Sequence, residues 1–204
     1  MKNNGCDNPS TLSYKGDILQ QKKAVLQIAA WLKGDSGRMS VLRQASQLQL
    51  PDWCIGAGFV RNLVWDKLHG YSRATPYNDI DIIYFDVQDC SQQRDRMLER
   101  QLLQQSKLPW SVKNQARMHF NNGDMPYNSC ADAMSYWPEV ETAVAAKLNG
   151  LGEIEIIAPL GTASLFAGNI SINPKRAKPE VFARRLAQKQ WLRQWPKLRV
   201  TVAG

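Results

Sequence analysis

Long apolar runs are missing from this sequence, and none is long enough to span a bilayer. The first segment, Met1 to Tyr14, also lacks the apolar block of a signal peptide. We therefore expect no membrane partner and a location in the cytoplasm. Internal repeats and low-complexity segments are absent as well, which favours one globular domain with at most a small addition.

Side chains that commonly bind zinc are few and scattered. There is no Cys-x-x-Cys pair, and the four cysteines are Cys6, Cys54, Cys90 and Cys130. This spacing is typical of free thiols in a reducing compartment and argues against a zinc site. His69 and His119 are the only histidines. Because neither belongs to a cluster with ligand spacing, we expect structural roles for both.

Positive charge is in excess. The 204 residues include 26 Lys and Arg against 18 Asp and Glu, which gives a formal net charge of +8. This surplus suits a polyanionic partner, either a nucleoside triphosphate or a nucleic acid. In many basic proteins, however, the surplus positive charge serves only solubility, and neither partner is bound. The hydrophobic share of 44% is that of an ordinary globular domain with its own core.

A glycine turn follows a short apolar stretch. Trp53 to Ile55 predicts a strand, Gly56-Ala57-Gly58 a turn, and Phe59 to Leu68 a helix. Such a turn brings backbone N–H groups and a helix N-terminus close to a ligand, which favours phosphate. Arg61 and Asn62, one turn into this helix, are candidates to contact that ligand. A surface salt bridge is the alternative role for Arg61.

Two carboxylates open the next predicted strand, which runs from Asp79 to Phe85. Strand side chains alternate between faces, so Asp79 and Asp81 point the same way. Two negative charges side by side repel each other unless a cation lies between them, and a divalent metal that carries a nucleotide satisfies this requirement. The alternative is an exposed strand face whose acids pair with Arg61 or Lys113.

This order of motifs resembles the nucleotidyltransferase superfamily, which includes DNA polymerase beta and the tRNA CCA-adding enzymes. The run from Ile55 to Asn62 is similar to the Gly-Gly-x-Val-Arg-Asp of CCA-adding enzymes and poly(A) polymerases. The chain also resembles a family of uncharacterised bacterial nucleotidyltransferase-like proteins over most of residues 20–200. That resemblance is carried by Val112 to His119, by Trp137-Pro138-Glu139 and by Ala158 to Gly161.

The resemblance implies that Gly56 and Gly58 hold the nucleotide phosphates and that Arg61 contacts a phosphate. It also implies that Asp79 and Asp81 are the catalytic carboxylates and the ligands of Mg²⁺ (or Mn²⁺).

The chain departs from the superfamily pattern in three ways. Twenty residues separate Gly58 from Asp79, more than is usual, which predicts an inserted loop over residues 69–78. Ala57 stands where the common pattern has glycine or serine. A third carboxylate, which many members use as a general base, is not obvious, and Glu153 and Glu155 on one strand face are the candidates.

The stretch 110–120 alternates between apolar and polar residues and predicts a half-buried strand. Its polar face carries Lys113, Gln115 and Arg117, which could bind the nucleotide and neutralise the charge of the leaving pyrophosphate. A solvated sheet face is the alternative. Asn114 interrupts the apolar face, either as a satisfied core amide or as a site residue.

Helices that bracket three to five strands predict an α+β fold, a nucleotidyltransferase-like mixed β-sheet flanked by helices. We expect residues 1–16 to be a flexible N-terminal segment and residues 17–204 to be a single domain with helical N- and C-terminal additions. The first helix would be capped by Asp17 and end at Gly34. Further helices are expected from Ser36 to before Pro51 and over residues 91–106, 138–148, 159–168 and 179–194, and further strands over residues 153–158 and 198–202.

The last predicted helix combines Trp191 and Trp195 with basic residues that include Arg184 and Arg185. We expect its tryptophans to pack on the core and its cations to face water. Binding of single-stranded nucleic acid is the alternative.

The sequence thus predicts a Mg²⁺-dependent nucleotidyltransferase. It would move a nucleoside monophosphate from a nucleoside triphosphate to an unknown acceptor hydroxyl, with nucleic acid a possible acceptor, and release pyrophosphate. A module that keeps the nucleotide or RNA pocket but has lost transfer is the rival prediction.

Overall fold

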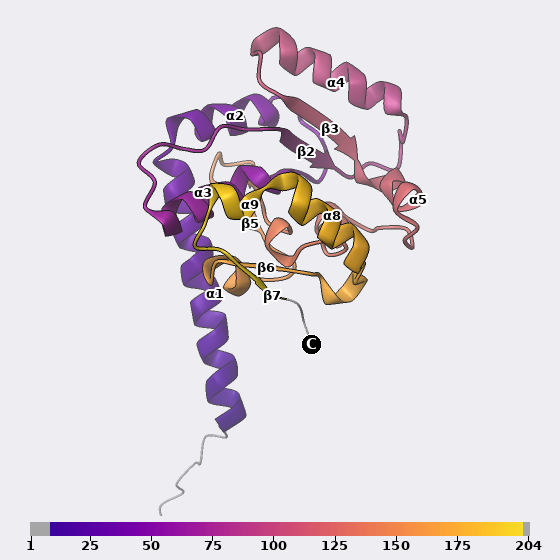
Figure 1. Cartoon of the computed structure of the whole chain (residues 1–204). Coiled ribbons are helices and arrows are strands. Elements are labelled where there is room, and N and C mark those ends of the chain that lie inside the picture. Colours follow the sequence, from indigo (N-terminus) through magenta and orange to yellow (C-terminus); the bar gives the residue numbers. More distant parts are fainter. Residues whose placement is uncertain (1–8, 202–204) are drawn as a thin grey trace, which may run out of the picture.

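The computed structural model describes residues 9–201. A five-stranded mixed sheet of order β3-β2-β1-β4-β5 forms its centre, with helices on both faces (Figure 1). The strands are β1 (Trp53–Gly56), β2 (Ile80–Tyr84), β3 (Trp110–Asn114), β4 (Ala145–Leu148) and β5 (Ile154–Ile157). Within this five-stranded sheet, β2 and β3 are the one parallel pair among the described strands. The predicted α+β fold, a mixed sheet flanked by helices, is therefore confirmed.

One face of the sheet is covered by the N-terminal half of the chain and forms the main core. Ile55, Ile82 and Val112 are fully buried on this face. The helices that cover it are α1 (Pro9–Lys33), α2 (Ser36–Ser46), α3 (Gly58–His69) and α4 (Gln92–Gln105). Because strand side chains alternate, Asp81 and Lys113 must point to the opposite face.

That opposite face is covered only in part. Over β1 and β4 the short helix α6 (Cys130–Met134) packs with Cys54, Ile83 and the Trp137 ring. Over β2 and β3 the face borders a pocket that is limited by α5 (Met118–Asn122) and α8 (Pro179–Lys189). Asp81 is among the residues that line this pocket.

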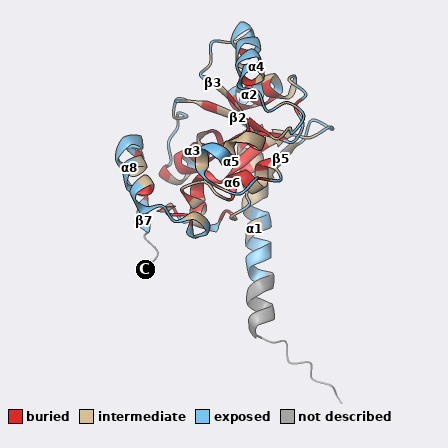
Figure 2. Cartoon of the chain, turned by 90° about the vertical axis from the view of Figure 1, so that its right-hand side faces the viewer, coloured by how far each residue is buried: buried red, intermediate tan, exposed pale blue. Residues whose placement is uncertain are grey.

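The C-terminal segment returns across the molecule (Figure 1). After α7 (Ala163–Phe166), a small parallel sheet joins β6 (Asn169–Ser171) to β7 (Arg199–Thr201). Helix α8 lies at the surface with its outer side exposed (Figure 2). It breaks at Gln190, whose φ of 50° is left-handed, and α9 (Trp191–Gln194) follows in a new direction.

The helix predicted over residues 138–148 is wrong. The segment forms a 3-10 helix at Val140–Thr142 and then strand β4, which lies between β1 and β5. Ala143 to Ala146 are almost completely buried. The alanine-rich composition favours a helix locally, but pairing with two neighbouring strands inside the core outweighs that small preference.

The N-terminal prediction needs a similar correction. Helix α1 begins at Pro9, eight residues before the predicted cap at Asp17. Residues 9–16 of the predicted flexible segment therefore belong to α1, and residues 1–8 lie outside the described residues. In the described part of the chain no helix is long and apolar enough to cross a membrane.

The strand predicted over residues 110–120 ends early. The Asn114 side chain accepts a hydrogen bond from the Ala116 N–H at 3.0 Å and caps a 3-10 helix over Gln115–Arg117, which leads into α5. Beyond Asn114 the alternation of apolar and polar residues therefore does not correspond to a strand. The helix predicted over residues 159–168 is shorter than expected and covers only Ala163–Phe166. The other predicted helices and strands lie close to their predicted positions, as does the loop before Asp79.

Candidate active site

The two predicted metal ligands lie on one face at the start of β2. The strand register pairs Asp81 with Ser111 of β3, and its continuation sets Gly56 of β1 beside Asp81 on the other side. Because β1 is antiparallel to β2, the turn after Gly56 and the N-terminus of α3 lie at the end of the sheet where Asp79 enters. The predicted neighbourhood of carboxylates and glycine turn is thus formed.

The charge of Asp79 acts on the neighbouring Asp81 carboxyl. Burial raises the pKa of the Asp81 carboxyl, and the negative charge of Asp79 raises it further. Ser111, Lys189 and Lys113 act in the opposite direction. Asp79 is about half exposed, and its nearest ion-pair partner is Lys189 at 3.9 Å. Neither carboxylate is locked onto an arginine, so a cation can approach the pair.

These carboxylates fit a divalent metal by their chemistry. Two adjacent oxygen-donor groups, the Asp81 carboxyl with its raised pKa and the half-exposed Asp79 carboxylate, suit a hard cation such as Mg²⁺. Asp79 and Asp81 would hold the ion, and water and phosphate oxygens would complete its coordination. Among the residues that the structure describes, no group of three or more His, Cys, Asp or Glu side chains is arranged for a metal.

Glu153 and Glu155 do not supply a third carboxylate. They lie on or beside β5, which is three strands away from β2, a distance of about 14 Å at the usual strand spacing. Glu155 instead pairs with Lys147 at 3.4 Å, and Glu153 accepts a hydrogen bond from Asn149 at 3.1 Å. The interpretation of these residues as the general base is therefore wrong.

The glycine turn shows why small residues are needed. A Cβ atom on Gly56 would lie 2.6 Å from Cη2 of the Trp137 indole, closer than atoms approach in proteins. Ala57 has φ 50° and ψ −118°, a conformation that glycine adopts easily and alanine does not. Gly58 begins α3. Since the first N–H groups of a helix have no acceptor within it, this turn can bind phosphate oxygens.

Arg61 is buried beside this turn between two indole rings. Its guanidinium carbon lies 4.8 Å from the centre of the Trp65 ring and 4.7 Å from that of Trp191. Its Nη2 donates to Oδ1 of Asn62 at 2.9 Å, while its Nε has no acceptor among the described residues. Burial lowers the pKa of Arg61 to about 10, and the charge of Glu139 limits the decrease. A surface salt bridge, the alternative role for Arg61, is absent from the described part of the chain.

Lys113 and Gln115 line the pocket beside Asp81, which has a volume of about 610 Å³. Lys113 is on the same strand face as Asp81, and its Nζ is 3.2 Å from Glu99. Gln115 is buried and donates to the carbonyl of Lys113 at 3.2 Å. These two side chains therefore lie in the same pocket as Asp81, and their contact with a nucleotide stays a prediction.

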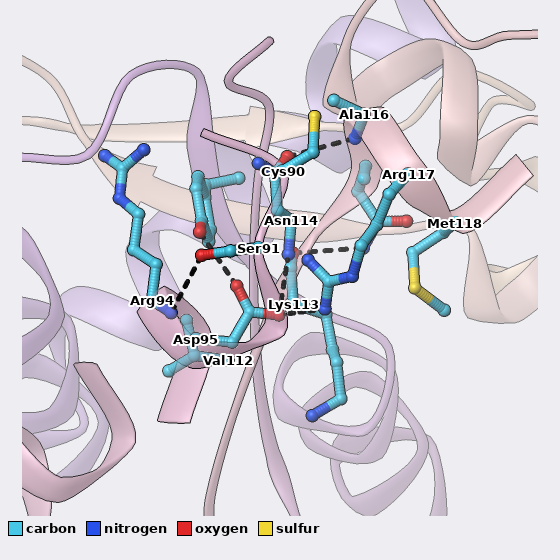
Figure 3. Close-up of polar contacts among 12 residues, drawn as sticks. Cys90, Ser91, Arg94, Asp95, Val112, Lys113, Asn114, Ala116, Arg117 and Met118 are labelled. Carbon is cyan, nitrogen blue, oxygen red and sulfur yellow. Dashed lines mark hydrogen bonds and ion pairs between the residues drawn. The ribbon is translucent and has the colours of Figure 1, made fainter. Parts of the chain in front are cut away.

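Arg117 lies elsewhere. Its guanidinium is ion-paired with Asp95 of α4 (Figure 3), and it is not among the residues that line the pocket. Asp95 is buried and also accepts a hydrogen bond from the Tyr84 hydroxyl at 2.8 Å. Asn114 belongs to the same network and has all its amide hydrogen bonds satisfied, so it is a core amide. The early end of β3 explains the displacement of Arg117 from the strand face.

The sequence did not single out the contribution of α8. Arg184, Arg185 and Gln188 of this helix line the pocket beside Asp81, together with Trp137. Trp191 and Trp195 are buried as predicted. Arg184 is exposed, as predicted for the cations of this helix, whereas Arg185 is half-buried and pairs with Glu139. The spacing of residues 181, 184, 185 and 188 marks one helix face and was the available signal.

Comparison with known proteins agrees with this geometry. A family model described as nucleotidyltransferase matches residues 43–200. A solved structure described as revealing a CCA-adding enzyme head domain is 30% identical, with a TM-score of 0.78 over 87% of this chain and 96% of that one. No curated protein matches the chain.

A solved CCA-adding enzyme in complex with CTP has the same fold at 15% identity, with a TM-score of 0.55 over 87% of this chain. The chain spans 43% of the length of that enzyme. The fold is therefore nucleotidyltransferase-like. The chain belongs to the nucleotidyltransferase family.

Proposed function

We propose that this protein is a metal-dependent nucleotidyltransferase that moves a nucleoside monophosphate from a nucleoside triphosphate to an acceptor hydroxyl and releases pyrophosphate. The observation that carries the proposal is the position of Asp79 and Asp81 on one strand face beside Gly56 and the start of α3. Membership of the nucleotidyltransferase family supports it. Asp79 and Asp81 would be the catalytic residues and the ligands of Mg²⁺ or Mn²⁺.

Binding of the triphosphate would use the glycine turn. The free N–H groups at the start of α3 and the Arg61 guanidinium would bind phosphate oxygens, and Asn62 would orient Arg61 through their hydrogen bond. Bound divalent metal would neutralise charge on the phosphates and favour ionisation of the acceptor hydroxyl. Lys113 and Gln115 would adjoin the reacting phosphate. Arg117, which pairs with Asp95, would reach a nucleotide only by leaving that pair.

The transfer itself is an in-line displacement. An oxygen of the acceptor forms a bond to the α-phosphorus while the bond from this phosphorus to the oxygen bridging the β-phosphate breaks. Pyrophosphate leaves with that bridging oxygen and its electron pair, and the hydroxyl proton passes to solvent. The protein's part is to hold the two reactants in line and to stabilise the charge of the triphosphate.

Transfer is tested with α-labelled nucleoside triphosphates in Mg²⁺ or Mn²⁺, beginning with CTP, together with small hydroxyl compounds and RNA ends as acceptors. We expect labelled product and pyrophosphate from the natural protein and none from Asp81→Asn. Asp17→Asn removes an exposed acid of α1 and should retain activity. Labelled product that persists in both Asp79→Asn and Asp81→Asn would refute the assignment.

A binding module on the same fold is the second candidate, because the described residues offer no third carboxylate at the pair. Such a module would bind the triphosphate only with metal, would lose binding in Asp81→Asn, and would release no pyrophosphate with any acceptor. Measurement of binding and pyrophosphate release in one sample separates the two.

We also place the protein in the cytoplasm. Cys54, Cys90 and Cys130 are free, as expected for a reducing compartment. Cell fractionation tests this location, and recovery of the protein from an oxidising compartment would contradict it.

A further inference from the structure

The pocket beside Asp81 has a strongly positive lining. It lies between the β2–β3 face of the sheet and α8, with a volume of about 610 Å³. Asp81 is the only carboxylate among its lining residues in the described chain. The cations that line it are Lys113, Arg176, Lys178, Arg184 and Arg185, and we call this cavity the basic pocket.

Part of this positive charge is not neutralised by the protein. Three of the five cations have a carboxylate partner outside the lining. The pairs are Arg185 with Glu139 at 2.5 Å, Arg176 with Asp124 at 2.5 Å, and Lys113 with Glu99 at 3.2 Å. Lys178 and Arg184 have no ion pair with any residue from 16 to 201. A cavity wall with two cations that lack a carboxylate partner in this range favours an anionic ligand.

The basic pocket begins beside the glycine turn, where Trp137 of its lining lies against Gly56, and extends away from the turn. The turn and the start of α3 adjoin the beginning of β2, whereas the pocket follows β2 and β3 toward Ile83, Lys113 and Gln115. The Asp81 carboxylate therefore lies between the turn and the far part of the pocket. In-line displacement requires the attacking oxygen and the leaving pyrophosphate on opposite sides of the α-phosphorus. With the outer phosphates at the turn, the basic pocket is on the side of attack.

The size of the pocket and a contact across its lining favour a small occupant. Its volume is in the range of small-molecule sites, about 300–1,000 Å³. Arg176 and Lys178 both donate to the carbonyl of Asn122, which joins α5 to the segment that precedes α8. A nucleic acid strand that passed between these two segments would have to break this contact.

We propose that the basic pocket is the acceptor site and that the acceptor is a small molecule carrying a phosphate monoester, bound by Arg184 and Lys178. This inference rests on the proposed nucleotidyl transfer, because the side of attack is defined by that reaction. It names the chemical class of the acceptor, which the family does not.

Calorimetry on the full chain tests the proposal. Inorganic phosphate and a series of phosphate monoesters, each beside its unphosphorylated parent (for example ribose 5-phosphate and ribose), are titrated with Mg²⁺ and an α,β-methylene triphosphate that cannot transfer. We expect a monoester to bind at least tenfold more tightly than its parent. Arg184→Gln and Lys178→Gln should each weaken that binding about tenfold, as for one lost charge-assisted contact. Arg100→Gln, an exposed arginine of α4 outside the pocket, should change nothing.

The outcomes separate this proposal from the proposed function. Affinity for the triphosphate analogue should stay within about twofold in Arg184→Gln, whose side chain is on the acceptor side. If the monoesters and their unphosphorylated parents bind with equal affinity, the proposed acceptor class is wrong. It is also wrong if an oligonucleotide with a free 3′-hydroxyl binds more tightly than every monoester and loses this affinity in Arg184→Gln. An equal loss of analogue affinity in Arg184→Gln assigns the pocket to the nucleotide instead. If the triphosphate analogue does not bind in the presence of metal but monoester binding still depends on Arg184, the proposed nucleotidyl transfer is contradicted. The basic pocket is then still supported as an anion-binding site.

Discussion

Substitution of Gly56 by alanine probes the contact between the glycine turn and the pocket. The added methyl carbon would lie 2.6 Å from Cη2 and 3.3 Å from Cζ3 of Trp137, whereas ordinary contacts are 3.4–4 Å. The indole would therefore have to move by about 1 Å. Its own backbone is held, since the Trp137 carbonyl accepts a hydrogen bond at 2.8 Å from the buried amide of Asn173. The ring must turn away from its present packing.

We expect Gly56→Ala to lower the free energy of unfolding by about 2 kcal/mol, within the usual cost of overpacking. For a chain of this size this corresponds to a decrease in Tm of about 4–8 °C. Trp137→Phe removes the atoms that collide, so the double variant should be more stable than the sum of the single effects by about 1 kcal/mol.

Urea unfolding followed by circular dichroism measures these differences. Gly150→Ala is the matched control, because a Cβ at Gly150 has no neighbour within 4 Å, and it should leave the free energy of unfolding almost unchanged. Strictly additive effects of Gly56→Ala and Trp137→Phe would refute the reasoning, as would a Gly56→Ala variant as stable as the natural protein.

Three further variants test other parts of the site. Ala57→Gly should raise the free energy of unfolding by about 1 kcal/mol, because it relieves a backbone with φ 50° and ψ −118°; an unchanged urea midpoint would contradict this. Trp191→Leu should raise the KM for the triphosphate about tenfold, because the Arg61 guanidinium loses the aromatic ring beside it, whereas Trp191→Phe should retain most of the affinity. Equal KM values for the two variants would show that stacking on Trp191 does not position Arg61. Asp95→Asn should cost about 3 kcal/mol in urea unfolding, because Arg117 loses its buried partner, and a loss below 1 kcal/mol would show that the pair contributes little.

The carboxylate pair and glycine turn could be predicted from the sequence because they are local. Trp53 to Ile83 contains one strand, one turn, one helix and the next strand in order, so the alternation of strand side chains already places Asp79 and Asp81 on one face. The antiparallel pairing of β1 and β2 then brings them to the turn.

Long-range contacts decided the features that sequence patterns missed. Strand β4 is alanine-rich and reads as a helix until β1 and β5 pair with it. Arg117 follows the alternation of its neighbours, yet Asn114 ends the strand with a local side-chain hydrogen bond. The place of Arg184 on the pocket wall depends on how α8 packs against the sheet, more than 100 residues after Asp81.

Crystals soaked with Mn²⁺ and an α,β-methylene triphosphate test the central claim most directly. Anomalous diffraction at the manganese edge should show an ion at about 2.2 Å from carboxylate oxygens of both Asp79 and Asp81, with the outer phosphates at the start of α3. An ion bound elsewhere, or a nucleotide bound away from this pair, would contradict the account.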